Sequence, residues 1–232
     1  MRKVIVADVD RIDFQNSLED VHLVDSESER DSDGTLLIDR NNYGNVLDLK
    51  NAFIPSSMFR PNDSPNGLHV YFELELYPFF QKVRDVITSD PSPKGVFRLR
   101  RIMKNKNELI IADDLYVLDT VFGKPECIYV KQTNRNVSPH HVIVTVNFGG
   151  GTMAHLDYTF SNEDLIELEW SGNKKIIEFS STEMHPVEPA GNSSLPLSYN
   201  VDSILALSHK VDGEIMKRHK YLTDLVQGGD QQ

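Results

Sequence analysis

The residues that decide the fold lie between Ala112 and Trp170, beginning with the segment ADDLYVLDTVFGKP (112–125). Its apolar side chains recur with the spacing of one helical face, and these are Leu115, Leu118, Val121 and Phe122. Gly123 suits the left-handed residue that ends many helices, and Pro125 prevents the helix from continuing. The segment therefore predicts a helix from Ala112 to the residue before Gly123.

Strand-like runs follow this helix and are separated by short turns. They are ECIYVKQT (126–133), HHVIVTVNF (140–148), GTMAHLDYTF (151–160), LIELEWS (165–171) and KKIIEFSS (174–181). Two sets of side chains alternate along the second run: His141, Ile143, Thr145 and Asn147 on one face, and Val142, Val144, Val146 and Phe148 on the other. The triple glycine 149–151 predicts a hairpin, and so does the turn 171–173.

The N-terminal part of the chain is less regular. Its strand-like runs are RKVIVAD (2–8), VHLVD (21–25) and TLLID (35–39). Residues 55–67 contain three prolines and several turn-forming residues, which favours a loop or linker. We therefore expect a short, degenerate α/β segment over residues 1–77 and a second domain over residues 78–232.

The second domain is expected to open with a helix, PFFQKVRDVITSD (78–90), and a strand, GVFRLRRI (95–102), whose basic side chains face solvent or pair with local acids. Residues 200–227 predict a closing helical region that is split near Gly213. This order predicts an α+β fold: an open, mostly antiparallel sheet with helices on one face, preceded by a small truncated α/β segment.

Composition excludes several classes of function. The chain has 232 residues and a net charge of −11, so general binding to nucleic acid is not expected. Cys127 is the only cysteine, which rules out an internal disulfide and a cysteine-based zinc cluster. No apolar run has the length of a membrane span or the core of a signal peptide, and we expect a cytoplasmic protein.

No metal site is expected. The acidic run 25–34 has part of a calcium-loop spacing, but Glu29 would occupy the first ligand position and Arg40 the twelfth. His140 and His141 are adjacent in a strand and point to opposite faces, so they do not share one ion. Histidines at a surface or an interface are the simpler interpretation.

Four segments in this order resemble the second domain of the Gfo/Idh/MocA oxidoreductases, the family of glucose–fructose oxidoreductase and inositol dehydrogenase. They are PFFQKVRDVITSDPSPKGVFRLR, DDLYVLDTVFGKPECIYV, HHVIVTVNFGGGTMAHLDYTF and LIELEWSGNKKIIEF, and together they cover about residues 77–183. The resemblance implies NAD(P)-dependent oxidation or reduction of sugars, inositols and related polyols. It also implies a glycine-rich nucleotide loop, a Glu-Lys-Pro lysine, and an Asp/His pair on the helix before the meander.

The family's catalytic residues do not carry over. With Gly123 on the family glycine, the catalytic His falls on Asp113 and the Asp one turn earlier falls on Leu109. Asp113 is the remaining candidate for a catalytic base, and an exposed carboxylate at the helix start is the simpler interpretation. GLHVYFELEL (67–76) echoes the family's lysine-bearing strand with Leu74 at the lysine. An alternative alignment assigns LELYP to the start of the following helix, and it lacks the lysine too.

The nucleotide loop is also missing, because no glycine follows RKVIVA until Gly34. Asp8 or Asp10 could take the place of the family's ribose-binding carboxylate. Without a glycine-rich turn neither would have a pyrophosphate site beside it. We therefore expect no cofactor, with NAD(P) as the alternative.

The first functional hypothesis is a non-catalytic relative of the family that serves in oligomerisation or in sensing a sugar-like ligand. Its partner would be a second copy, in a dimer through the sheet, or a full-length family relative. The residues assigned to the interface are His141, Ile143, Thr145 and His155. Two alternatives stay open: a divergent NAD(P)-dependent oxidoreductase, alone or as a subunit of a split enzyme, and an unrelated α+β binding or scaffold module.

Overall fold

The computed structural model describes residues 3–17, 21–24, 34–41, 51–59, 67–104, 107–181 and 197–228. The chain divides into two units. The first comprises Met1–Phe80 and Ser198–Lys220, and the second comprises Gln81–Leu197 and Tyr221–Gln232. The sequence analysis expected residues 78–232 to form the second domain. In the structure, residues Ser198–Lys220 return to the first unit.

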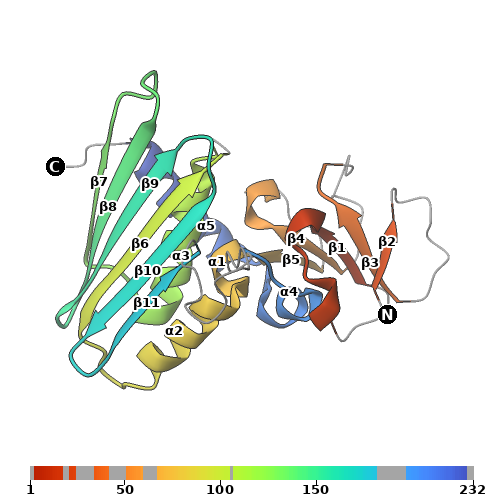
Figure 1. Cartoon of the computed structure of the whole chain (residues 1–232), viewed down its shortest axis with the longest axis horizontal. Coiled ribbons are helices and arrows are strands. Elements are labelled where there is room, and N and C mark those ends of the chain that lie inside the picture. Colours follow the sequence, from red (N-terminus) through yellow and green to blue (C-terminus); the bar gives the residue numbers. More distant parts are fainter. Residues whose placement is uncertain are drawn as a thin grey trace, which may run out of the picture. The chain divides into compact units, whose positions relative to one another are not determined.

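A six-stranded sheet forms the centre of the first unit, in the order β12-β5-β4-β1-β3-β2 (Figure 1). Five of its strands are parallel: β1 (Lys3–Ala7), β2 (Val21–Val24), β3 (Thr35–Asp39), β4 (Ala52–Pro55) and β5 (Leu68–Tyr71). The two-residue β12 (His209–Lys210) pairs antiparallel with β5, which explains why residues after 198 belong to this unit. The strands β1, β2 and β3 lie where the sequence predicts them, while β4 and β12 were not anticipated.

Short helical segments complete the first unit. The 3-10 turns are η1 (Val9–Arg11), η2 (Phe14–Asn16) and η3 (Ser56–Met58), and the α-helices are α1 (Glu73–Leu76) and α4 (Val201–Leu207). Helix α4 lies against α1, and Asn200 caps it by accepting a hydrogen bond from the Ser203 N–H at 2.7 Å. The strands of this sheet are apolar on both faces, as is usual for parallel strands, and Ile5, Val6 and Leu37 are completely buried.

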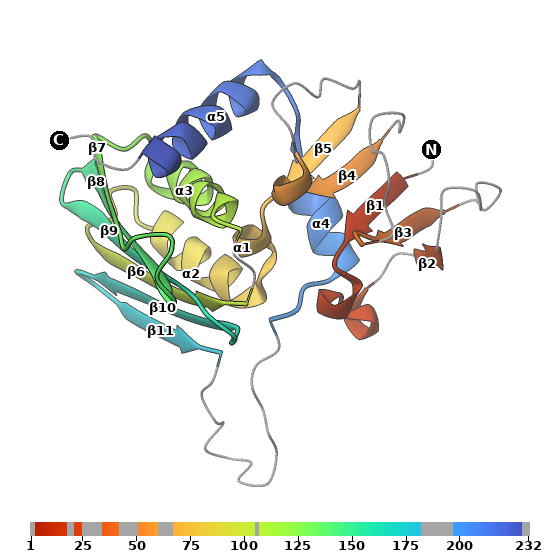
Figure 2. The same cartoon turned by 90° about the horizontal axis from the view of Figure 1, so that it is seen from above.

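The second unit contains a larger, mostly antiparallel sheet in the order β11-β10-β6-β9-β8-β7. Its strands are β6 (Gly95–Met103), β7 (Cys127–Gln132), β8 (His140–Gly149), β9 (Thr152–Phe160), β10 (Leu165–Gly172) and β11 (Ile176–Ser180). The central pair β6–β9 is parallel and every other pair is antiparallel. Figure 2 shows α3 (Leu109–Phe122) along one face of this sheet, together with most of α2 (Pro78–Thr88). The α+β prediction, with helices on one face of an open sheet, is confirmed.

Side-chain alternation decides which face of this sheet meets the helices. Val142, Val144 and Val146 of β8 are buried on the helix side, whereas Ile143 is 40% exposed on the opposite side. The predicted hairpins β8–β9 and β10–β11 both form, and Gly123 ends α3 with a φ of 86°.

Two expectations about the second unit need correction, and one about the closing helical region is confirmed. Helix α3 begins at Leu109 rather than at Ala112, because Ile110 and Ile111 extend its apolar stretch by nearly one turn. The basic side chains of β6 do not all face solvent, because Arg101 lies on the helix side and is 2% exposed. The closing region is divided as predicted, into α4, β12 and α5 (Gly213–Gly228).

Some expectations concern residues outside the described part of the chain. These are most of the acidic run 25–34, residues 60–66 of the expected linker, and the proline-rich segment before residue 197. None of the helices in the described part combines the length and the apolar character of a membrane-spanning helix.

Candidate functional site

Side chains meet at the carboxyl edge of the parallel sheet in the first unit. Strand β1 lies between β3 and β4, so the direction of the chain's progress across the sheet reverses at β1. In open parallel sheets the crevice beyond the strand ends at such a reversal is the usual place for a ligand. Asp8 follows β1 and Arg40 follows β3 at this edge, and Glu73 opens α1 just after β5.

Arg11 organises the polar side chains near the end of β1. One of its guanidinium nitrogens donates to Glu73 Oε1 at 2.9 Å and to the Tyr77 hydroxyl at 2.7 Å. The Tyr77 hydroxyl in turn donates to the same Glu73 carboxylate, and Arg11 Nε lies 3.9 Å from Asp8 Oδ2. Arg11 and Glu73 are each about one quarter exposed, so the pair is partly shielded from solvent. The network holds one cation, Arg11, and two carboxylates, Glu73 and Asp8, so it retains negative charge.

Two buried tyrosines lie beside this network. The Tyr71 hydroxyl donates to the Val6 carbonyl oxygen of β1 at 2.8 Å, and the Tyr71 and Tyr199 rings meet at 6.5 Å. Burial, followed by the neighbouring Tyr199 and Glu73, raises the pKa of Tyr71 well above its ordinary value. Burial and next the Glu73 carboxylate also raise the pKa of Tyr199. Both hydroxyls therefore stay protonated near neutral pH.

The exit of β1 does not fit a dinucleotide. A pyrophosphate is held by backbone N–H groups at the start of a helix that follows a glycine-rich turn. Here β1 leads into the three-residue η1, which Asp8 precedes and which contains Asp10. The residue after η1, Ile12, bridges to Tyr199, with hydrogen bonds from Asp13 N to Tyr199 O (2.9 Å) and from Tyr199 N to Arg11 O (3.0 Å). The segment after β1 therefore contains neither a glycine-rich turn nor the start of a long helix.

The two cofactor candidates differ in their surroundings. Asp8 is partly buried and lies beside Arg11, while Asp10 is exposed. The echo of the family's lysine-bearing strand agrees with the structure in its first alignment, since β5 ends at Tyr71 and Glu73 follows it directly. The alternative alignment is wrong, because α1 ends at Leu76 and α2 begins separately at Pro78.

In the second unit, the catalytic candidate Asp113 is 2% exposed inside α3. The interpretation of Asp113 as an exposed carboxylate is wrong, because the helix begins four residues earlier and turns this side chain inward. Its neighbour Asp114 is completely buried, and the sequence analysis did not single it out.

Asp114 is enclosed by two partners from the sheet. Arg101 donates to Asp114 Oδ1 at 2.9 Å, and the Tyr158 hydroxyl donates to Oδ2 at 3.0 Å. The Arg101 Nε atom also lies 2.8 Å from Oδ2, although its N–H is not aligned for a hydrogen bond. Burial and then the Asp114 charge raise the pKa of Tyr158 well above its ordinary value. The cluster fastens α3 to β6 and β9 and presents no carboxylate to a substrate.

The four residues assigned to an interface lie together on the face of the second sheet that the helices leave open. Thr145 pairs with His155 across β8 and β9, and their side chains approach to 3.4 Å. His141 Nδ1 lies 2.9 Å from the Thr159 hydroxyl, and Ile143 lies between the two contacts. His140 points to the opposite face from His141, as predicted, but it is buried and not at the surface. The described residues contain no group of three or more acidic, histidine or cysteine side chains that could hold a metal ion.

Charged residues continue this open face across β6 and β10. Arg98 pairs with Glu169 at 2.6 Å and Arg100 with Glu167 at 3.1 Å. Both pairs are substantially exposed, so each contributes at most about 1 kcal/mol to folding. The face is thus ordered and polar at its centre, with Ile143 and the exposed Tyr129 towards the β7 edge.

Comparison with known proteins bears on the fold. No family model matches the chain, and no curated protein sequence matches it either. Among solved structures, a probable dehydrogenase from Thermotoga maritima is 10% identical with a TM-score of 0.53, over 97% of this chain and 87% of that one. A dehydrogenase from Chromobacterium violaceum is 9% identical with a TM-score of 0.51, over 98% and 96%.

Two further similarities cover a smaller share of the other protein. An oxidoreductase from Agrobacterium radiobacter is 12% identical with a TM-score of 0.41, over 78% of this chain. The chain spans 64% of the length of that protein and 65% of a further oxidoreductase from Magnetospirillum magnetotacticum. The two sheets and the order of their strands and helices give this chain the fold of the Gfo/Idh/MocA oxidoreductases.

Proposed function

We propose that this chain is a non-catalytic relative of the NAD(P)-dependent sugar and polyol oxidoreductases and that it associates with a second copy of itself. The observation that carries the proposal is the open face of the β6–β11 sheet, which is ordered by ion pairs and holds exposed apolar side chains such as Ile143 and Met153. A sheet face that no helix covers and that carries both apolar and polar side chains suits association with a partner.

The distribution of charge favours a second copy as that partner. Acidic Glu167 and Glu169 lie on β10 and Glu178 on β11, whereas the β7 edge carries Lys131. A two-fold axis parallel to the strands and between the central β6 and β9 places each acidic edge over the β7–β8 edge of the other copy. Glu178 then lies level with Tyr129 of the other copy, two residues along β7 from Lys131, and the same approach recurs in both halves, as a symmetric dimer requires.

The non-catalytic part of the proposal rests on residue identity and burial. Leu109 replaces one carboxylate of the family's helix, Asp113 is buried, and Leu74 stands at the position of the lysine. The exit of β1 lacks a pyrophosphate cradle, so we infer that NAD(P) is not bound. The loss of these catalytic and cofactor-binding features is also compatible with two other roles. One is the sensing of a small sugar-like ligand, and the other is association with a full-length relative.

The test is the mass of the purified chain in solution by light scattering, at several concentrations and with or without NADH and NADPH. We expect a mass of twice the 26.4 kDa of one chain, unchanged by either nucleotide. A monomer at all concentrations would contradict the association. Saturable binding of either nucleotide, together with polyol oxidation, would favour the alternative of a divergent oxidoreductase or a subunit of a split one, which the fold supports.

A further inference from the structure

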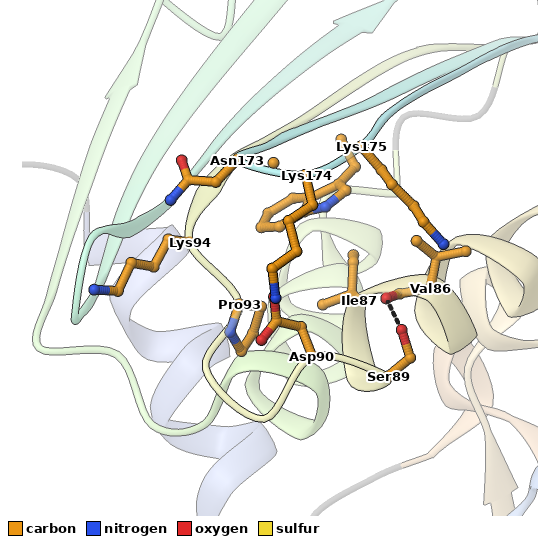
Figure 3. A pocket seen from close by; sticks show the side chains of 11 residues that line it. Val86, Ile87, Ser89, Asp90, Pro93, Lys94, Asn173, Lys174 and Lys175 are labelled. Atoms are coloured by element: carbon orange, nitrogen blue, oxygen red, sulfur yellow. Dashed lines mark hydrogen bonds and ion pairs between the residues drawn. The ribbon is translucent and has the colours of Figure 1, made fainter.

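A pocket of about 220 Å³ opens in the second unit, where the end of α2 faces the turn between β10 and β11 (Figure 3). Its apolar wall includes Val86, Ile87, Pro93 and Trp170. This volume suits a compact molecule, because pockets for larger ligands begin at roughly 300 Å³. The pocket lies apart from the open sheet face, so binding of a ligand there does not depend on self-association.

Trp170 provides a rigid part of this wall. The chain's single tryptophan is 4% exposed and stacks on Phe122 with ring centres 5.5 Å apart. Gly172 packs so closely against it that a Cβ there would lie 2.6 Å from the indole nitrogen. The indole N–H donates to no acceptor within the described residues, so it remains available as a donor.

The polar rim of the pocket carries excess positive charge. The lining includes three lysines, Lys94, Lys174 and Lys175, and the single carboxylate of Asp90, although Figure 3 shows the Lys94 ammonium group directed away from that carboxylate. Lys174 donates to Asp90 Oδ2 at 2.8 Å, and this contact, with the Ser92 N–H, holds the pKa of Asp90 below its ordinary value. Figure 3 shows Lys94 and Lys175 on opposite sides of the Lys174–Asp90 pair. Neither forms an ion pair within the part of the chain that the structure describes.

We propose that this pocket binds a small organic anion, in which a carboxylate or phosphate group is attached to a compact apolar body. The apolar body would lie against Trp170 and Ile87, while the anionic group would meet Lys94 or Lys175. A cation would be repelled by the rim, since the net side-chain charge there is positive in a chain whose overall charge is −11. A small inorganic anion would gain nothing from the apolar wall.

Intrinsic fluorescence of Trp170 is a direct probe, because no other tryptophan contributes. Cyclohexanecarboxylate and cyclohexyl phosphate distinguish the two anionic groups, cyclohexanecarboxamide is the neutral match, and inorganic phosphate lacks the apolar body. We expect a saturable change with at least one organic anion. The single indole N–H resonance in a nitrogen–proton correlation spectrum should shift with the same dependence on ligand concentration.

Variants locate the anionic group. Lys94→Gln or Lys175→Gln should weaken binding by about two- to fivefold, as expected for loss of an exposed charge contact. Lys124→Gln, an exposed lysine after α3, removes the same charge elsewhere and should leave binding unchanged. Equal binding of the neutral amide, or of inorganic phosphate, would overturn the proposal. So would an indole resonance that no probe shifts, or Lys94→Gln and Lys175→Gln variants that both bind like the unsubstituted chain.

Discussion

Asp114 of α3 and Arg101 of β6 form an ion pair in the interior of the second unit, with 2.9 Å between the hydrogen-bonded atoms and almost no exposure of either side chain. Removing one member of such a pair leaves the other charge buried and uncompensated, at a cost of about 3–5 kcal/mol. We expect Arg101→Met to destabilise the chain by this amount, measured by urea unfolding followed through Trp170 fluorescence.

The neighbouring Arg100 is a matched control for this variant. It lies on the same strand but on the open face, where its pair with Glu167 is exposed on both sides. Arg100→Gln should therefore cost less than about 1 kcal/mol. In addition, the double variant Arg101→Met/Asp114→Leu should be more stable than Arg101→Met alone. If Arg101→Met and Arg100→Gln had equal effects, the buried pair would not have the role assigned to it.

The buried tyrosines predict loss of stability at alkaline pH. Burial raises the pKa values of Tyr71, Tyr158 and Tyr199 in the folded chain, whereas in the unfolded chain each titrates near 10.0. Above that pH the unfolded state holds fewer protons than the folded state, so the free energy of unfolding falls as pH rises. Their contribution is fully present below pH 10 and decreases by up to about 1.4 kcal/mol per pH unit for each tyrosine.

Urea unfolding between pH 8 and pH 11.5 measures this dependence. Tyr158→Phe should reduce the slope above pH 10, because one titrating hydroxyl is gone. It should also cost about 1–2 kcal/mol at neutral pH, since Asp114 loses a hydrogen-bond donor. Tyr221→Phe, at an exposed position, should change both quantities less than Tyr158→Phe does. A slope that is unaffected by Tyr158→Phe would contradict the assignment.

Much of the second unit could be predicted because its strands have one face against helices and one open. Alternation along β8 placed Val142 and Ile143 on opposite faces, and the structure shows Val142 buried and Ile143 exposed. The same rule also applied to adjacent arginines: in a strand, Arg100 and Arg101 must point to opposite faces, so one of them had to enter the core. That signal was present in the sequence and was overlooked.

Other features depend on contacts between residues far apart in the chain, which local patterns do not contain. The Arg11–Glu73 contact joins residues 62 positions apart, and β12 meets β5 only after the chain returns from the second unit. The start of α3 was misplaced although Asn107 marks it, because Asn107 Oδ1 accepts a hydrogen bond from the Leu109 N–H at 3.2 Å. That signal was overlooked, and the internal position of Asp113 follows from the earlier start of the helix.

Gly172 is required by the packing of Trp170. A Cβ at this position would lie 2.6 Å from the indole nitrogen, and the ring cannot retreat because Phe122 stacks against it. Gly172→Ala should therefore cost about 1–3 kcal/mol, as overpacking in a filled core does. Gly213→Ala is the control, since a Cβ at Gly213 meets nothing within 4 Å. Thermal unfolding followed by circular dichroism compares the two, and equal midpoints would show that the ring shifts freely.

Ile143 provides the sharpest test of association through the open sheet face. It is 40% exposed in the isolated chain and lies between the His141–Thr159 and Thr145–His155 contacts. A glutamate at this position would carry a charge into the proposed dimer interface, between Lys131 of β7 and Asp157 of β9, but would face solvent in the monomer. Ile143→Glu should therefore halve the mass in solution while it leaves the circular dichroism spectrum and the unfolding midpoint of the dilute protein unchanged.

Val137→Glu, at an exposed position in the turn before β8, introduces the same charge away from this face and should remain dimeric. A dimer that survives Ile143→Glu would place the interface elsewhere, since an apolar contact at the centre of this face would have been replaced by a charge.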